Sequence, residues 1–319
     1  MTAAATTAVF DLAMRVRFRG QRRRQGVLVR GAAGWGEFSP FPEYDDRVAA
    51  RWLAAALEAA ERGWPPPQRD AIPVNTTVPA VDPETAHAMV VAAKCATAKV
   101  KVAEPGQPLA ADVARVEAVR DALGPSGALR IDANGAWSVD AAVEALRALG
   151  RFDLEYAEQP VATLEEMASL RRRIDVPLAA DESVRTAADP LRVRGLDAAD
   201  VVVLKVQPLG GVRACLEVAE ACGLPVVVSS AIETSVGIAA GVALAAALPE
   251  LRFACGLGTV PLLAADVCSE PLAPVDGWLP VRPVEPDPAL VTAAAADAAA
   301  TAWWHDRLTR VRAVLGGDG

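Results

Sequence analysis

Residues 98–133 read AKVKVAEPGQPLAADVARVEAVRDALGPSGALRIDA. Two short apolar runs in this stretch, Ala98–Val102 and Leu129–Ala133, have the composition of strands that are buried on both faces. The amphipathic segment Leu109–Leu123 between them has the length and periodicity of a helix. A strand, a helix and a second strand in this order predict a βαβ unit, in which the two strands are parallel.

The same unit recurs along the middle of the chain, where short apolar runs alternate with helix-sized segments. Eight such units have the size of a TIM-type (β/α) barrel. A doubly wound open sheet is the alternative, but no GxGxxG motif follows the first run. The predicted strands are Ile72–Val78, Ala98–Val102, Leu129–Ala133, Leu154–Ala157, Pro177–Ala180, Val201–Val206, Pro225–Ser229 and Arg252–Cys255.

The two ends of the chain differ from this middle part. Residues 1–70 predict two strands, a turn and an Ala-rich helix near Arg47–Arg62, whereas residues 269–319 are Pro-rich and then helical. We expect the two ends to associate as a small α+β capping domain. This domain would cover the mouth of a catalytic (β/α) barrel formed by residues 71–268.

The composition is that of a globular protein, with 319 residues, 52% of them hydrophobic, and a net charge of −8. An acidic total argues against a nucleic-acid partner and against an anionic membrane surface. The basic run Arg19–Arg24 is interpreted first as the solvated tip of a hairpin. The competing interpretation has residues 16–27 close over the barrel mouth and become ordered on ligand binding.

The sequence predicts neither a membrane-spanning segment nor a signal peptide. The Ala-rich stretch Val236–Leu248 is shorter than the roughly 18 apolar residues that a bilayer requires, so it predicts a packed helix. The first residues have no basic start of the kind that signal peptides carry. The five cysteines form an odd set without a CxxC motif, which is typical of reduced, buried thiols. We therefore expect a cytoplasmic protein.

Polar side chains follow several predicted strands at their carboxyl ends, where the active sites of such barrels form. Alternation along a strand places Lys99 and Lys101 on one face of the second strand. It places Arg130 and Asp132 on one face of the third. Further carboxylates, a lysine and two hydroxyls end the following strands, at Glu158, Asp181, Lys205, Ser229 and Ser230.

Three of these side chains, Asp132, Glu158 and Asp181, form a set of oxygen ligands that suits Mg²⁺. The lysines beside them stand out because only four of the 32 basic residues are lysine. A buried lysine can lose its proton, whereas arginine effectively cannot. A divalent metal with a nearby lysine base predicts removal of the weakly acidic proton next to a carboxylate.

The motifs that hold these residues follow one another at regular intervals. They are KVK (99–101), RIDANGAW (130–137), EQP (158–160), ADES (180–183) and LKVQPLGG (204–211), with GWGEFSP at 34–40. As an ordered set, they resemble the muconate-lactonizing subgroup of the enolase superfamily. The resemblance implies that Asp132, Glu158 and Asp181 bind the metal, that Lys101 and Lys205 flank the substrate α-carbon as catalytic residues, and that Lys99 lies beside the substrate carboxylate.

The ends of the last strands narrow the choice within this subgroup. The eighth strand ends in Cys255–Thr259 without the Asp-x-Asp that similar dipeptide epimerases use to hold an ammonium group. The two histidines, His87 and His305, lie in helix-like segments rather than where a mandelate-racemase base would stand. The short cap, the run SSAIETSVG (229–237) and Arg130 resemble the o-succinylbenzoate synthases.

This resemblance implies an Mg²⁺-dependent dehydration of 2-succinyl-6-hydroxy-2,4-cyclohexadiene-1-carboxylate to o-succinylbenzoate, a step of menaquinone biosynthesis. It implies substrate contacts from Lys99, Arg130, Ser229, Ser230 and Gly256. Three alternatives stay open: an N-acylamino acid racemase, a muconate-type cycloisomerase and a barrel that binds a ligand without turnover. The expected partner is a small carboxylate, with no nucleic acid or membrane, and the oligomeric state is open.

Overall fold

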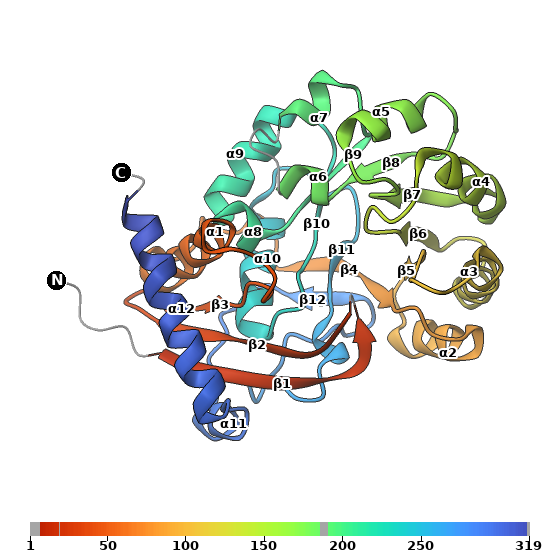
Figure 1. Ribbon diagram of the computed structural model, residues 1–319. Coiled ribbons are helices and arrows are strands. Elements are labelled where there is room, and N and C mark those ends of the chain that lie inside the picture. Colours follow the sequence, from red (N-terminus) through yellow and green to blue (C-terminus); the bar gives the residue numbers. More distant parts are fainter. Residues whose placement is uncertain (1–6, 19, 186–190, 318–319) are drawn as a thin grey trace.

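The computed structural model describes residues 7–18, 20–185 and 191–317 (Figure 1). A barrel of parallel strands with helices around it forms the larger part. A three-stranded sheet and the C-terminal helix lie against one side of this barrel. The expected fold class, a TIM-type barrel with an α+β cap, is therefore confirmed.

The cap is built from both ends of the chain. Its antiparallel sheet has the order β1-β2-β3, and apolar side chains of both ends share one core, which contains Phe38, Trp52, Trp304 and Leu308. The elements of the cap are β1 (Thr7–Phe18), β2 (Gln21–Arg30), β3 (Trp35–Phe38), α1 (Asp46–Leu57) with its continuation η1 (Glu58–Arg62), α11 (Pro288–Ala293) and α12 (Ala298–Gly317).

The barrel sheet has the order β10-β9-β8-β7-β6-β5-β4-β11, and each neighbouring pair is parallel. An isolated parallel bridge between Ser229 and Gly256 closes the circle between β10 and β11. A further strand, β12 (Trp278–Pro280), pairs antiparallel with β4. The parallel strands are β4 (Ala71–Val78), β5 (Thr97–Lys101), β6 (Ala128–Asp132), β7 (Leu154–Glu158), β8 (Leu178–Ala180), β9 (Val201–Leu204), β10 (Val226–Val228) and β11 (Cys255–Gly258).

The last barrel strand lies later than the sequence predicts. The prediction ended at Cys255, where the observed β11 begins. Two glycines, Gly256 and Gly258, lower the β-propensity of this segment, and the sequence pattern therefore did not predict a strand there. The close approach of β10 explains the first glycine, because a Cβ atom at residue 256 would lie 2.4 Å from Ser229 Oγ.

Several helices of the barrel begin at a side-chain cap. Asp82, Ser138 and Thr163 each accept a hydrogen bond from the first turn of α2, α4 and α5, and Thr163 forms a capping box with Glu166. The helical segments are α2 (Pro83–Ala93), α3 (Leu109–Leu123), α4 (Val139–Leu149), η2 (Gly150–Phe152), α5 (Leu164–Arg171), α6 (Glu182–Arg185), α7 (Arg192–Gly195), α8 (Val206–Leu209), α9 (Val212–Cys222), α10 (Ser235–Ala247) and η3 (Val260–Leu262).

Helix α10 is buried nearly throughout. This agrees with the packed helix that the sequence predicts for residues 236–248. Within the described residues, no helix combines the length and apolar character that crossing a bilayer would take. All five cysteines lie within the described residues and are buried, and none of them is in a disulfide.

A buried carboxylate joins the cap to α10. Glu37 of β3 accepts hydrogen bonds from the backbone N–H of Thr234 (3.1 Å), the hydroxyl of Thr234 (2.5 Å) and the N–H of Gly237 (3.1 Å). The Ser39 hydroxyl donates to its other oxygen at 2.6 Å. Burial and the nearby Glu233 carboxylate nevertheless raise the pKa of Glu37 to about 7.

We predict that Glu37→Gln removes part of the pH dependence of stability. The folded-state pKa of about 7 lies above the ordinary value of 4.5. The wild-type protein should therefore lose unfolding free energy as pH rises through this window, by up to about 3 kcal/mol from this group. The neutral amide cannot titrate. The difference in unfolding free energy between the two proteins should therefore change with pH only between 4.5 and about 7.

Urea unfolding of both proteins from pH 4 to pH 8.5 measures this difference. The matched control is Glu61→Gln, which changes an exposed glutamate of the same domain and should keep the wild-type profile. A Glu37→Gln profile parallel to the wild-type profile at every pH would contradict the prediction.

Candidate active site

Strand register brings the predicted site residues to one level of the barrel. Lys101 on β5 is paired with Asp132 on β6, and Asp132 is paired with Glu158 on β7. Asp181 and Lys205 directly follow β8 and β9. Because all these strands are parallel, their carboxyl ends meet at the same mouth, and the five side chains converge there.

The convergence produces a buried network of ion pairs. Lys99 Nζ lies 2.9 and 3.0 Å from the two carboxylate oxygens of Glu158 and 3.3 Å from Asp132 Oδ2. Lys101 Nζ lies 2.5 Å from Asp132 Oδ2, and Lys205 Nζ lies 2.5 Å from Asp181 Oδ2. The three carboxylates are at most 1% exposed, so each depends on a neighbouring ammonium group to offset the cost of burying its charge.

The two lysines of β5 differ in how their surroundings act on them. Burial lowers the pKa of Lys101, and the Lys99 ammonium lowers it further, so the attraction of Asp132 does not restore the ordinary value. Burial also acts on Lys99, but the carboxylates of Glu158 and Asp132 outweigh it and raise its pKa. Lys101 is therefore the lysine of β5 that gives up a proton more readily.

The carboxylates repel one another in this site. Burial and the charge of Asp132 raise the pKa of Glu158 to about 7. In contrast, Lys101 and Lys99 outweigh burial at Asp132 and lower its pKa. In the parts of the chain that the structure describes, no three His, Cys, Asp or Glu side chains are arranged as a ready metal site. Three adjacent buried carboxylates are nevertheless an oxygen-only set, which fits a hard divalent cation.

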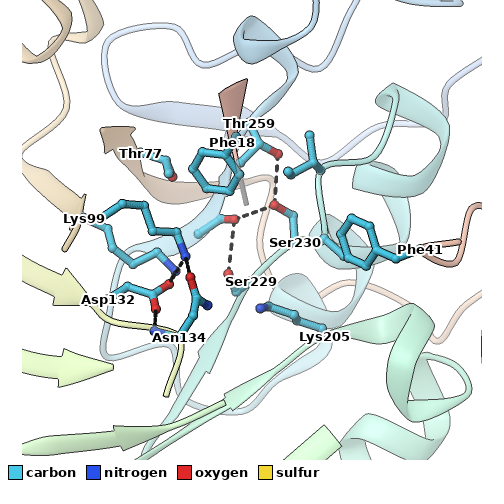
Figure 2. A pocket seen from close by; sticks show the side chains of 14 residues that line it. Phe18, Phe41, Thr77, Lys99, Asp132, Asn134, Lys205, Ser229, Ser230 and Thr259 are labelled. Atoms are coloured by element: carbon cyan, nitrogen blue, oxygen red, sulfur yellow. Dashed lines mark hydrogen bonds and ion pairs between the residues drawn. The ribbon is translucent and has the colours of Figure 1, made fainter. Parts of the chain in front are cut away.

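A small cavity lies beside this network (Figure 2). Its volume is about 30 Å³, which is room for a few water molecules but not for a ring-sized substrate. Phe18 and Phe41 of the cap form part of its wall, together with barrel residues. The barrel residues are Thr77, Lys99, Lys101, Asp132, Asn134, Lys205, Ser229, Ser230, Ala231, Ile232, Gly256 and Thr259.

A second hollow of about 280 Å³ lies outside the first and shares three lining residues with it, Phe18, Lys101 and Asn134. The Phe18 ring stands 5.1 Å from Lys101 Nζ. Phe18 is the one cap residue among the three that line both spaces.

Amides hold the ends of three strands in place. Asn134 Oδ1 accepts from Lys101 Nζ at 2.6 Å, and Asn134 Nδ2 donates to Glu182 at 3.0 Å. Gln159 Oε1 accepts from the backbone N–H groups of Asp181 and Ser183. Asn134 therefore joins Lys101 to Glu182. Its left-handed φ of 48° also shapes the turn after β6.

The expected substrate-binding residues divide into two groups. Lys99, Ser229, Ser230 and Gly256 line the inner cavity. Arg130 does not, although it lies on the same face of β6 as Asp132. Its guanidinium donates to Glu155 at 2.5 Å and to the backbone oxygen of Ala254 at 2.7 Å, and it stacks on the Tyr156 ring. Arg130 lies two residues nearer the amino end of its strand, and its donors are occupied in the barrel interior.

Several functional candidates were not found from the sequence. Phe18 and Phe41 line the cavity from the cap. The sequence predicted a role only for segments near them, namely the basic hairpin and the motif GWGEFSP. The solvated-tip interpretation of Arg19–Arg24 holds for Arg22 and Arg23, which are exposed. It is wrong for Arg24, which is 2% exposed. Arg19 lies outside the described residues.

Comparison with known proteins finds family models that match both the barrel and the cap. A family model described as "Enolase C-terminal domain-like" matches residues 83–286, and one described as "Enolase N-terminal domain-like" matches residues 9–60. Among solved structures, muconate lactonizing enzyme from Pseudomonas fluorescens, complexed with muconolactone, has a TM-score of 0.80. It is 23% identical, with 92% of this chain and 99% of that chain covered, and at this identity the likeness shows the fold alone.

Curated relatives are closer in sequence. A Thermobifida fusca protein named o-succinylbenzoate synthase is 65% identical over 308 residues, which cover 97% of this chain and 96% of that protein. A Mycolicibacterium smegmatis protein of the same name is 55% identical over 309 residues, with 96% and 95% covered. The likeness therefore extends over cap and barrel together.

We predict that removing the Lys99 charge destabilises the protein. In Lys99→Met the apolar stem is kept, but Glu158 and Asp132 lose an ammonium partner inside the barrel. Breaking a buried ion pair costs about 3–5 kcal/mol of unfolding free energy. Urea unfolding at pH 8 in the presence of a chelator measures this loss of unfolding free energy.

The chain offers a matched control in Lys94→Met. The Lys94 side chain is 71% exposed and pairs loosely with Asp276, so its loss should change the unfolding free energy by no more than about 0.5 kcal/mol. Equal losses in the two variants would show that the Lys99 charge is not needed to balance the buried carboxylates.

Proposed function

Because the chain belongs to the enolase superfamily, we propose that it catalyses the reaction of its named relatives, the o-succinylbenzoate synthases. It dehydrates 2-succinyl-6-hydroxy-2,4-cyclohexadiene-1-carboxylate to o-succinylbenzoate, a step of menaquinone biosynthesis, and is thus a hydro-lyase. The observation that carries this proposal is 65% identity to such a protein over 97% of the chain. The buried lysines and carboxylates supply the groups that the reaction needs.

Lys101 is the proposed base. Its neutral amine takes the proton from the ring carbon that bears the carboxylate, and the electron pair of the broken C–H bond moves toward that carboxylate. The lowered pKa of Lys101 favours the neutral amine. Lys101, now an ammonium, then returns the proton to the leaving hydroxyl on the same face of the ring. Water departs, the new double bond completes the aromatic ring, and Lys101 is neutral again.

Lys205 and Lys99 are proposed to act as cations. Lys205 extends from β9, on the side of the mouth away from β5, and is held by Asp181 at 2.5 Å. It would face the opposite side of the ring and stabilise the electron-rich π system. Lys99, whose pKa is raised by Glu158 and Asp132, would stay charged beside the substrate carboxylate.

The proposed metal ligands are Asp132, Glu158 and Asp181, and the proposed metal is Mg²⁺. When bound, a divalent cation would stabilise the negative charge that develops on the substrate carboxylate as the proton leaves. The raised pKa of Glu158 supports this assignment, because burial and the nearby Asp132 carboxylate disfavour its charged form and a bound cation would favour it. The lysines that neutralise them here also remain beside the cavity for substrate.

The rest of the cavity would hold and shield the substrate. We assign contacts with the small carboxylate substrate to Ser229, Ser230 and Gly256. The rings of Phe18 and Phe41 would exclude water during the reaction. The placement of Arg130 does not support its expected substrate contact, and we leave it out of this set.

Three finer assignments accompany the proposal. The ordered KVK, DANG, EQP and LKVQPLGG motifs support membership of the muconate-lactonizing subgroup. The five buried cysteines, none of which is in a disulfide, support a reducing compartment, the cytoplasm. We also keep the division into a cap (1–70 and 269–319) and a barrel (71–268), with β12 of the second cap segment added to the barrel sheet at β4.

The direct test follows the loss of the diene absorbance when purified protein and Mg²⁺ meet the cyclohexadiene carboxylate. We predict that the protein is inactive in a chelator and regains activity with Mg²⁺. Asp132→Asn, Glu158→Gln and Asp181→Asn should each lower both metal affinity, measured by calorimetry, and turnover. Full turnover in metal-free protein would remove the cation from the mechanism.

A second prediction separates the lysines by role. Lys101→Ala should abolish dehydration, because one group supplies both base and acid, and such groups contribute about 10²–10⁴-fold. Lys205→Arg keeps a cation that cannot lose its proton, so part of the dehydration should survive. Racemisation of N-acylamino acids, which needs two lysines that exchange protons, should disappear in the same variant.

The two variants are assayed for both reactions with circular dichroism as a check on folding. Near-normal dehydration by Lys101→Ala, together with none by Lys205→Arg, would place the base on the opposite side of the mouth. Loss of both reactions in Lys205→Arg would mean that Lys205 exchanges protons during dehydration as well.

A further inference from the structure

One residue of the cavity wall has a strained backbone. Ile232 lines the inner cavity and has a φ of 64°. A β-branched residue in this left-handed region is a true outlier, since its side chain clashes with its own backbone. Such a conformation persists only where surrounding contacts enforce it, and it is found most often at functional sites.

A buried arginine of the cap contacts the strained residue directly. Arg24 Nε donates to the backbone oxygen of Ile232 at 2.8 Å, and Nη2 of the same guanidinium donates to the backbone oxygen of Ser39 at 2.7 Å. The guanidinium also stacks on the Phe41 ring, 4.5 Å from its centroid. The planar, two-sided donor geometry of arginine thus ties β2 of the cap to residue 232 of the barrel.

A second cap residue holds the chain just after Ile232. Glu37 accepts the N–H groups of Thr234 and Gly237 and the Thr234 hydroxyl. Residue 237 is a glycine at a crowded position, where a Cβ atom would lie 2.5 Å from Glu233 Cβ and 3.0 Å from the Glu37 carboxyl carbon. The barrel segment is therefore held at residue 232 by Arg24 and at residues 234–237 by Glu37.

We propose that Arg24 and Glu37 are positioning residues that hold the 229–232 wall of the active site in its strained conformation, and that dehydration depends on this conformation. We call this pair of contacts the cap latch. The catalytic lysines and carboxylates stand on the barrel strands, whereas this wall is shaped from the cap. The inference rests on the proposed function, because its activity readout is dehydration.

Glycine adopts a φ of 64° without strain, and this provides the test. Arg24→Gln is measured alone and together with Ile232→Gly, as a double-mutant cycle. In the wild-type background, Arg24→Gln should lower kcat/KM by about tenfold to a hundredfold, the range that corresponds to strain of this kind. In the Ile232→Gly background, the same change should cost less than about threefold.

The neighbouring Arg23→Gln is the matched control. Arg23 is exposed and pairs with Asp11 at the surface, so its loss should leave kcat/KM within about twofold of wild type. If Arg24→Gln does not fold, Arg24→Lys takes its place in the cycle, because a lysine keeps the charge but cannot bridge residues 39 and 232 at once. An equal cost of the Arg24 change in both backgrounds would overturn the latch.

A readout other than activity separates this inference from the proposed function. Amide hydrogen exchange is followed over residues 230–237 and, as a reference, over α4 on the far side of the barrel. Arg24→Gln and Glu37→Gln should each speed exchange in the first segment by about tenfold or more and leave α4 unchanged, whereas Arg23→Gln should change neither.

The outcomes are distinct. Local acceleration of exchange in a protein that does not dehydrate the cyclohexadiene carboxylate would support the latch and overturn the proposed function. Dehydration by the wild type with no local change in exchange in either latch variant would support the function and overturn the latch. Equal acceleration in both segments would mean general destabilisation and would also overturn the latch.

Discussion

The mutual neutralisation of buried charges at the barrel mouth is the constraint on which the site depends. Three carboxylates that are almost fully buried cannot remain ionised in a protein interior without counter-charges. Lys99, Lys101 and Lys205 supply them at distances of 2.5 to 3.0 Å. The parallel register of β5, β6 and β7 makes this possible, because it brings Lys101, Asp132 and Glu158 to one level.

The same arrangement gives similar lysines different properties. Lys99 and Lys101 stand two residues apart on one strand, and burial opposes the charge of both. Lys99 contacts both Glu158 and Asp132, whereas Lys101 contacts Asp132 and is repelled by Lys99. A permanent cation and a group able to release a proton therefore lie side by side. In the proposed mechanism, Lys99 would stay charged beside the substrate carboxylate while Lys101 takes the proton.

The sequence predicted the barrel and its charged mouth well, because both follow from local pattern. Strand alternation placed Lys99 and Lys101 on one face, and the regular spacing of the motifs placed Asp132, Glu158 and Asp181 at neighbouring strand ends. Strand alternation predicts the face of the sheet on which a side chain lies, but not how far from the barrel mouth it lies. This explains why Arg130 was expected beside the substrate although its partners, Glu155 and Ala254, lie near the amino ends of β7 and β11, away from the mouth.

The cap's contribution could not be predicted in the same way, because it arises from contacts between residues about two hundred positions apart. Arg24 looked like one of several surface arginines until the fold placed Ile232 against it. A wall held from the cap can change shape when cap residues change, while the strands that carry the lysines and carboxylates stay as they are. In the proposed latch, the barrel would carry the reacting groups, and the contact of the cap with residues 232–237 would fix the shape of the wall that faces them.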